Sequence, residues 1–244
     1  MLATHNLTSL QKHEEDLRAR SLAVIEAASA LSDHWNLVAD TMNAIYAFAH
    51  DHPHGSENEL MLQYLGIRLF NAAGASVKLA LSGYYQNAFA QMRDVIETYF
   101  LVDYLSTYPE KIEEWKHADK KKRISHFGPG LVRNMLDKRD GHTSGGRKRI
   151  YDSISELASH ATYSGISLTA TGPANMVQIG PFFDEKKLVT WLQEMAMRLS
   201  HATVVLVSNP EGKDLNLLMA RKCYLEAVNK WWSKYAGMKP QAAS

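Results

Sequence analysis

Two charged residues, Arg93 and Glu97, lie inside an otherwise apolar stretch that extends from Gly83 to Leu105. This stretch predicts a buried central helix, because apolar residues recur on almost every side of it at helical spacing. A separation of four residues places the two charges one turn apart on one face, so they can form a salt bridge or a paired functional site. A charge inside a core needs a partner, and this pair is therefore the first candidate for chemistry.

His160 is the residue that would complete such a site. It lies near the end of a later predicted helix, residues 146–163, and could meet the Arg93–Glu97 pair in space. A histidine can act as general acid or base on a 2′-hydroxyl, while an arginine stabilises the charge of a phosphorane. Arg93, Glu97 and His160 are therefore the predicted catalytic residues. A structural interpretation stays open, in which the pair is a salt bridge and His160 is its hydrogen-bonded neighbour.

Positive charge is concentrated in the middle of the chain. The net charge is only +1, yet residues 116–149 contain 11 Lys/Arg against three Asp. Phosphate neutralisation needs clustered cations rather than a high net charge, so this segment predicts nucleic-acid contacts. The predicted contact residues are Lys120, Lys121, Lys122, Arg123, Arg147, Lys148 and Arg149. For the first four, the alternative is the solvated C-terminal end of a predicted helix 109–123, where cations complement the helix dipole.

Three histidines at alternate positions, His50, His52 and His54, form the one cluster that resembles a set of metal ligands. No cysteine or ordered set of acidic ligands lies nearby in the sequence, so we interpret the segment as a solvated loop that ends at Pro53. Motifs for phosphate-binding loops, nucleophile elbows and zinc sites are absent from the sequence. We therefore predict neither a metal nor a cofactor.

The cysteine content and the apolar runs indicate where the chain functions. The single cysteine, Cys223, excludes an intramolecular disulfide, which fits a reducing compartment. The N-terminal residues lack the pattern of a secretory signal, and no apolar run reaches 18 residues. We expect a cytoplasmic protein without a membrane span.

One resemblance to a known superfamily emerges between residues 60 and 208. It is carried by the opening Gly83-Tyr84, the Arg93–Glu97 spacing, the aromatic continuation to Tyr104 and a later helix that ends in LASHATYSG. These features resemble uncharacterised helical families distantly grouped with the HEPN superfamily. Many HEPN proteins are ribonucleases of toxin–antitoxin or phage-defence systems and act as dimers whose active sites meet at the helix interface.

The nuclease motif of that superfamily, an arginine followed by a histidine after four to six residues, is not matched here. Two arginine–histidine pairs are too close together, Arg123–His126 and Arg198–His201, and a third, Arg149–His160, is too far apart. What the resemblance implies for this chain is therefore the helical fold, the dimer and RNA as a partner.

The predicted fold is an all-α bundle of about seven helices, treated as one structural domain. The long helices are expected at residues 8–31, 32–50, 59–82, 83–108, 146–163, 184–208 and 214–235, with shorter helical pieces at 109–123 and 131–136. An irregular segment or small hairpin is expected near 164–183, turning at Gly172 and Pro173. In terms of organisation, residues 1–55 form an N-terminal helical arm, 56–236 a HEPN-like helical domain and 237–244 a disordered tail.

The predicted function is RNA binding or metal-independent RNA cleavage in a stress or defence context, by a homodimer. The first alternative is a non-catalytic helical module that binds another protein. Adjacent residues of a helix cannot both face the same side, so one of Trp231 and Trp232 is a candidate for an oligomer contact; the alternative is core packing with a partly exposed edge. The second alternative is a small-ligand site beneath the segment that begins at Ser164.

Overall fold

We describe the fold from a computed structural model. It describes residues 6–159, 162–171, 176–177, 179–208 and 214–235. The predicted tail, 237–244, lies outside these residues, as do Gly172 and Pro173 of the predicted turn.

The described residues form ten α-helices and one short strand pair. The α-helices are α1 (Leu7–Ala27), α2 (Ser29–Tyr46), α3 (Glu57–Leu81), α4 (Tyr85–Thr107), α5 (Lys111–Lys116), α6 (Lys120–Phe127), α7 (Pro129–Arg139), α8 (Gly146–Ile154), α9 (Glu185–Ser208) and α10 (Leu215–Tyr235). Short π-helices follow α2 (Ala47–Asp51) and α8 (Ser155–Ser159), and a 3₁₀-helix covers Ser164–Thr169. The strands are β1 (Ala170–Thr171) and β2 (Met176–Val177). The prediction of an all-α fold is confirmed.

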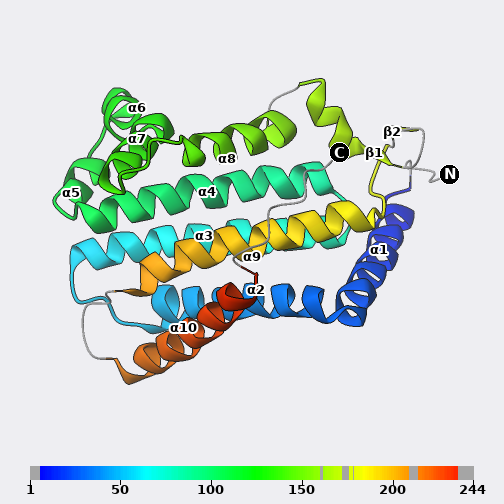
Figure 1. The fold of residues 1–244 in the computed structure, drawn as a ribbon, viewed down its shortest axis with the longest axis horizontal. Helices are drawn as coiled ribbons and strands as arrows, with labels where there is room; N and C mark the ends of the chain where they lie inside the picture. Colours follow the sequence, from blue (N-terminus) through cyan, green and yellow to red (C-terminus); the bar gives the residue numbers. More distant parts are fainter. Residues whose placement is uncertain (1–5, 160–161, 172–175, 178, 209–213, 236–244) are drawn as a thin grey trace.

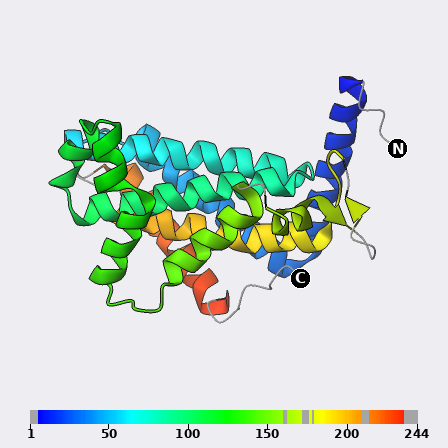
Figure 2. The same ribbon diagram turned by 90° about the horizontal axis from the view of Figure 1, so that it is seen from above.

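Four long helices, α2, α3, α4 and α9, lie lengthwise beside one another and make up the body of the molecule (Figure 1). Helix α4 packs extensively against α3 and α9, and α9 also packs on α2. Helix α1 stands across one end of this body and projects beyond it (Figure 2). The helices α5 to α8 cover the side of α4 that faces away from α2 (Figure 1).

Helix α4 is the buried central helix that its apolar sequence predicts. Its core residues include Phe89, Met92, Val95, Ile96, Phe100, Val102 and Leu105, each at most 8% exposed. The Nε1–H of Trp191 on α9 donates to Ser76 Oγ on α3 (2.9 Å), and that hydroxyl donates to the carbonyl of Ala88 on α4 (2.8 Å). This chain of bonds satisfies the polar groups of three helices inside the core, where unpaired groups would be costly.

Gly83 makes the turn between α3 and α4, as expected from its sequence position. Its φ of +85° lies in the left-handed region that glycine adopts without steric cost. The neighbouring backbone also leaves no room for a side chain, because a Cβ at this position would lie 2.8 Å from the nitrogen of Phe182. The segment before α9 therefore packs directly on this turn.

Side-chain caps fix several helix starts. Ser56 Oγ accepts from Glu59 N (3.2 Å), Asp184 Oδ1 from Lys187 N (3.0 Å) and Asp214 Oδ1 from Leu217 N (2.8 Å), so these predicted starts are confirmed. The first helix is different. It begins at Leu7, one residue before the expected start, and its cap is Asn6, whose side chain accepts from the amides of Thr8 and Ser9.

The prediction of one helix over residues 109–123 is wrong. The chain forms two helices there, and Asp119 separates them by capping the second, since its Oδ1 accepts from Lys122 N at 2.8 Å. The four basic residues 120–123 thus lie in the first turn of α6, and not at the end of a helix. The favourable interaction with the negative end of a helix dipole, which was the alternative explanation for these charges, does not exist.

The predicted irregular segment or hairpin near 164–183 contains both kinds of structure. A 3₁₀-helix, Ser164–Thr169, precedes two short antiparallel strands in which Ala170 pairs with Val177 and Thr171 with Met176. The helix predicted over 146–163 is an α-helix only to Ile154 and continues as a π-helix.

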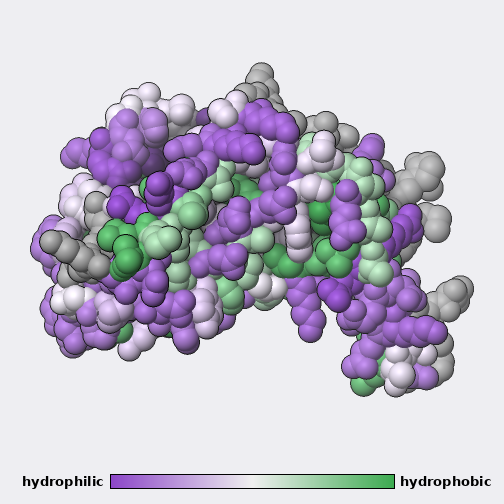
Figure 3. Space-filling view, turned by 90° about the horizontal axis from the view of Figure 1, so that it is seen from below, coloured by the Kyte–Doolittle hydropathy of each residue, from purple (hydrophilic) through white to green (hydrophobic). Residues whose placement is uncertain are grey.

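Helix α10 packs on α2 through an aromatic cluster. Trp231 is buried, whereas the next residue, Trp232, is 37% exposed, as expected for adjacent positions of a helix. Figure 3 shows the underside of the view in Figure 1, where apolar side chains form patches separated by polar ones. Within the described part of the chain, no helix combines the length and apolar character needed to cross a bilayer.

Candidate functional site

The strongest candidate site is formed by four residues on three helices, Arg93 and Glu97 on α4, Arg133 on α7 and Tyr151 on α8. We call it the Arg–Tyr cluster. Arg93 Nη2 lies 2.8 Å from Glu97 Oε1, so the salt bridge that the spacing allows is formed. The two side chains are 28% and 29% exposed, and the pair is therefore half-buried and not enclosed in the core as the apolar sequence around it suggests.

Tyr151 joins the two charged groups. Its hydroxyl accepts a hydrogen bond from Arg93 Nη2 (2.5 Å) and donates one to Glu97 Oε1 (2.7 Å). Burial disfavours the charged form of Arg93, but the Tyr151 hydrogen bond and the Glu97 carboxylate outweigh it and raise the pKa of the guanidinium. Arg93 therefore stays a cation whose position is fixed by its two partners.

Arg133 is the unusual member of the cluster. It is only 8% exposed, and its guanidinium carbon lies 4.0 Å from the centre of the Tyr151 ring. Among the described residues it has no carboxylate partner and no hydrogen bond, and its buried Nη1 is unsatisfied. The Nε of Arg93 is also buried without a hydrogen-bond partner. Stacking on an aromatic face compensates part of the cost of burying a charge, but it supplies no acceptor.

Sequence reasoning found half of this cluster. It placed Arg93 and Glu97 together, and the structure confirms their contact. The third predicted catalytic residue, His160, lies outside the described residues. The sequence did not predict Tyr151 and Arg133 as members of the site. The packing of α7 and α8 decides which of their residues face α4, and no local pattern indicates that packing. The available signal was that two charges on a buried helix need polar neighbours from other elements.

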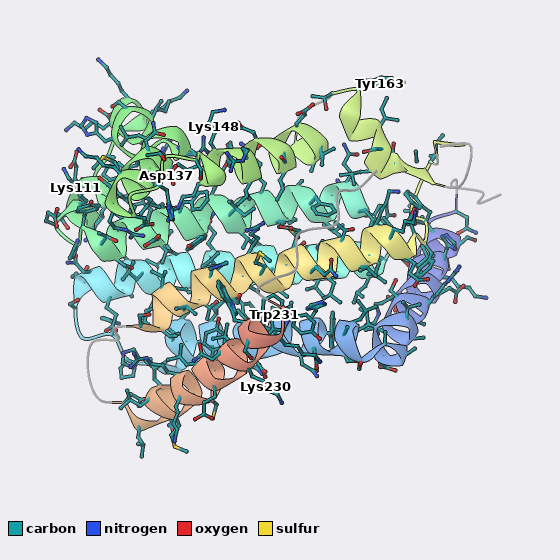
Figure 4. The ribbon with its side chains drawn as sticks, viewed as in Figure 1. Lys111, Asp137, Lys148, Tyr163, Lys230 and Trp231 are labelled. Atoms are coloured by element: carbon teal, nitrogen blue, oxygen red, sulfur yellow. The ribbon has the colours of Figure 1, made fainter. Side chains whose placement is uncertain are left out.

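A second group of charges ties α7 and the start of α8 to α4. Arg139 donates to Asp103 on α4 (2.6 Å) and to its neighbour Asp140 (2.6 Å), while Arg147 pairs with Asp137 (2.7 Å) and also with Asp140. The hydrogen bonds from Arg139 hold the pKa of Asp140 far below its usual range. Figure 4 shows Asp137 at the junction of α7 with its neighbours.

This network occupies one of the predicted nucleic-acid contacts. The side chain of Arg147 is 14% exposed and bound to two carboxylates, so it is already neutralised inside the fold. Lys148 lies on the outer side of α8 (Figure 4) and pairs with Asp152. The guanidinium of Arg149 donates to the carbonyl of Ser144. All three predicted contacts on α8 therefore have partners within the chain.

The predicted contacts on α6 have no such partners. Lys120, Lys121, Lys122 and Arg123 are all exposed, and within the described residues none of their side chains forms an ion pair or a hydrogen bond. They occupy the first turn of the helix, where the backbone amides already carry a partial positive charge. We call this group the α6 basic turn.

The three alternate histidines do not converge on a common point. His50 pairs with its neighbour Asp51 (2.7 Å), and His54 is exposed. His52 is buried, and its Nε2 donates to Glu59 Oε1 (3.2 Å). No group of metal-binding side chains occurs among the residues that the structure describes. His52 thus helps to fix the turn between α2 and α3, and the prediction of a fully solvated loop is wrong for this residue.

A shallow groove of about 430 Å³ lies between α3 and α4, lined by Tyr64, Ile67, Arg68, Gln91 and Asp94 among others. Its position differs from that of the ligand pocket considered beneath the segment that begins at Ser164. Arg68 and Asp94 pair across it at 2.5 Å.

Comparison of the chain with protein-family models, with curated proteins and with solved structures gives no match.

Proposed function

We propose that this protein binds RNA, and that the α6 basic turn is its main contact with the phosphate backbone. The observation that carries the proposal is the position of Lys120 to Arg123, four consecutive exposed cations without a carboxylate partner among the described residues. The proposal agrees with two expectations from the sequence, the resemblance to HEPN proteins and a cytoplasmic location, where RNA is accessible.

The electrostatics of α6 favour an external anion. Four cations repel one another and also the positive end of the helix dipole, so in the free protein their arrangement is unfavourable. Some cations elsewhere in the chain are neutralised, as Arg198 is by Glu194 (2.7 Å) and Lys234 by Asp33 (2.6 Å). The exposed lysines on other helices that have no carboxylate partner among the described residues, such as Lys12 and Lys186, do not form a run of four. A polyanion relieves the repulsion on α6 and releases its own condensed counterions on binding.

Cleavage of the bound RNA is the finer part of the proposal. Glu97 carries a carboxylate that can accept the proton of a 2′-hydroxyl while the 2′-oxygen bonds to phosphorus. The P–O5′ bond then breaks and the 5′-oxygen takes a proton from water, while Arg93 can stabilise the negative charge on the phosphorane oxygens. Both side chains are half-exposed and lie 2.8 Å apart. The test is incubation with RNA in the presence of a chelator, comparing wild type with Glu97→Gln.

A second candidate function, binding of a protein partner or of a second copy of the chain, is favoured by α10. Leu215 and Met219 are 68% and 60% exposed on this helix, and Trp232 is 37% exposed. Leu215 and Met219 lie one turn apart at the start of the helix and Trp232 near its end, and exposed apolar side chains of this kind are typical of contact surfaces between proteins.

The experiment that tests RNA binding compares two variants with the same change in net charge. In the first, Lys120, Lys121, Lys122 and Arg123 are replaced by glutamine. In the control variant, four exposed lysines on other helices are replaced, namely Lys12, Lys186, Lys222 and Lys230. Fluorescence anisotropy with a labelled single-stranded RNA should show a large loss of affinity in the first variant and a small one in the second. Equal losses would mean that only the net charge matters, and absence of binding by the wild type would refute the proposal.

A further inference from the structure

We infer that the Arg–Tyr cluster is a binding site for a phosphate-type oxyanion and that Arg133 is the main residue that contacts the anion. This site is distinct from the α6 basic turn, and the inference does not depend on RNA binding by that helix. It is carried by the burial of Arg133 without a compensating anion.

A buried guanidinium normally has a carboxylate or several acceptors near it, because removal of a charge from water costs several kcal/mol. Arg133 is 92% buried, since only 8% of its surface is exposed. Among the described residues it has neither, and the group that it stacks on is the Tyr151 ring, 4.0 Å from the guanidinium carbon. The nearest acidic residue on its own helix, Asp137, is already paired with Arg147 at 2.7 Å.

The charge balance of the cluster leaves one positive charge without a partner. Glu97 neutralises Arg93, to which it is bound at 2.8 Å, and it also accepts a hydrogen bond from the Tyr151 hydroxyl at 2.7 Å. The buried Nη1 of Arg133 and Nε of Arg93 both remain without an acceptor. Both guanidinium groups lie beside the ring of Tyr151, at 5.1 Å for Arg93 and 4.0 Å for Arg133, and each keeps an unsatisfied N–H, the kind of donor from which phosphate oxygens accept.

The more exposed charged members of the cluster are the two residues on α4. Arg93 and Glu97 are 28% and 29% exposed, whereas Arg133 is almost covered. Glu97 contacts the same tyrosine as Arg133, so its carboxylate repels an anion that is bound there. Removal of that carboxylate should therefore strengthen anion binding, whereas removal of Arg133 should abolish it.

The test measures melting temperature in inorganic phosphate and in chloride at equal ionic strength, with adenosine 5′-monophosphate as a third condition. At a hundredfold excess over Kd, phosphate or the nucleotide should raise the Tm of the wild type by about 5 to 10 °C above chloride. Stabilisation by phosphate alone identifies a free-anion site, and stronger stabilisation by the nucleotide identifies a phosphate ester as the ligand.

Three variants separate ligand binding from folding. Arg133→Met should lose the phosphate-dependent shift while it melts in chloride no lower than the wild type, because it removes an uncompensated charge. Arg133→Lys keeps the charge without the fork of donors, and its shift should be smaller than that of the wild type. Glu97→Gln should show a larger shift at the same phosphate concentration. Equal melting of the wild type in phosphate, nucleotide and chloride would overturn the inference, as would an undiminished phosphate shift in both Arg133 variants.

Discussion

The Nε1–H of Trp231 on α10 donates a hydrogen bond to Nδ1 of His34 on α2, with 2.9 Å between the two nitrogens. The rings also meet edge to face, with centroids 5.5 Å apart. Because Nδ1 is the acceptor, the proton of the neutral imidazole lies on Nε2, and this buried nitrogen has no partner. Protonation of Nδ1 would break the bond that holds α10 on α2.

Stability should therefore fall in acid through His34. Burial lowers the pKa of His34 from the ordinary value of 6.5. The charge of Lys234 lowers this pKa further, whereas the charge of Asp33 raises it without cancelling the effect of burial. Since the unfolded state binds the proton more readily, neutral His34 should make its full contribution to the free energy of unfolding above pH 6.5. That contribution should decrease as the pH falls below 6.5, by at most about 1.4 kcal/mol per pH unit. Urea unfolding at several pH values should show a weaker dependence in His34→Gln, whose amide oxygen can still accept from Trp231. An unchanged dependence would mean that other groups account for it. One such group is His201, because burial lowers the pKa of its imidazole to about 4.

Gly83 should tolerate no side chain. Gly83→Ala places a Cβ against the backbone of Phe182 at a φ of +85°, so we expect a loss of about 1 to 3 kcal/mol in the free energy of unfolding. Gly74→Ala is the matched control, because its Cβ would lie within α3 at an ordinary 3.8 Å from Met42, and it should gain about 0.5 to 1 kcal/mol. Chemical denaturation of both variants checks the contrast. Similar effects at the two positions would contradict the packing described for the turn.

The hydroxyl of Tyr151 should contribute measurably to stability. Tyr151→Phe keeps the ring beneath Arg133 but removes the bonds to Arg93 and Glu97, so we expect a loss of about 1 to 2 kcal/mol, limited by the partial exposure of both partners. In contrast, Tyr64→Phe, at a residue that is 54% exposed, should change stability by less than about 0.5 kcal/mol. A loss of equal size in both variants would show that the hydroxyl of Tyr151 is not specifically bonded.

The sequence predicts what depends on local patterns. Ser56, Asp184 and Asp214 begin helices where their side chains suggest, and the apolar residues around Met92 are buried as their spacing indicates. The break before α6 was also readable, because Asp119 is a good N-cap residue, but the acidic start and basic end of residues 109–123 imitate one continuous helix.

The candidate site was less predictable than the fold. The contact between Arg93 and Glu97 follows from their spacing, but the contact of Tyr151 with both depends on the orientation of α8 over α4. Arg133 lacks an acceptor among the described residues because of how α7 packs on α4 and α8, which no local sequence pattern indicates. Arg147 is likewise a predicted nucleic-acid contact, but in the fold it is already paired with Asp137 and Asp140.

The central claim, that the α6 basic turn contacts an RNA backbone, is tested most directly by the salt dependence of RNA affinity. Each phosphate that is neutralised on a single strand adds about 0.7 to the slope of log Kd against log salt concentration. Loss of the four cations of the α6 basic turn should therefore reduce this slope by about 3, while the control variant with four changed lysines elsewhere should keep the wild-type slope. A slope unchanged by the α6 substitutions, or reduced equally in the control, would contradict the proposal.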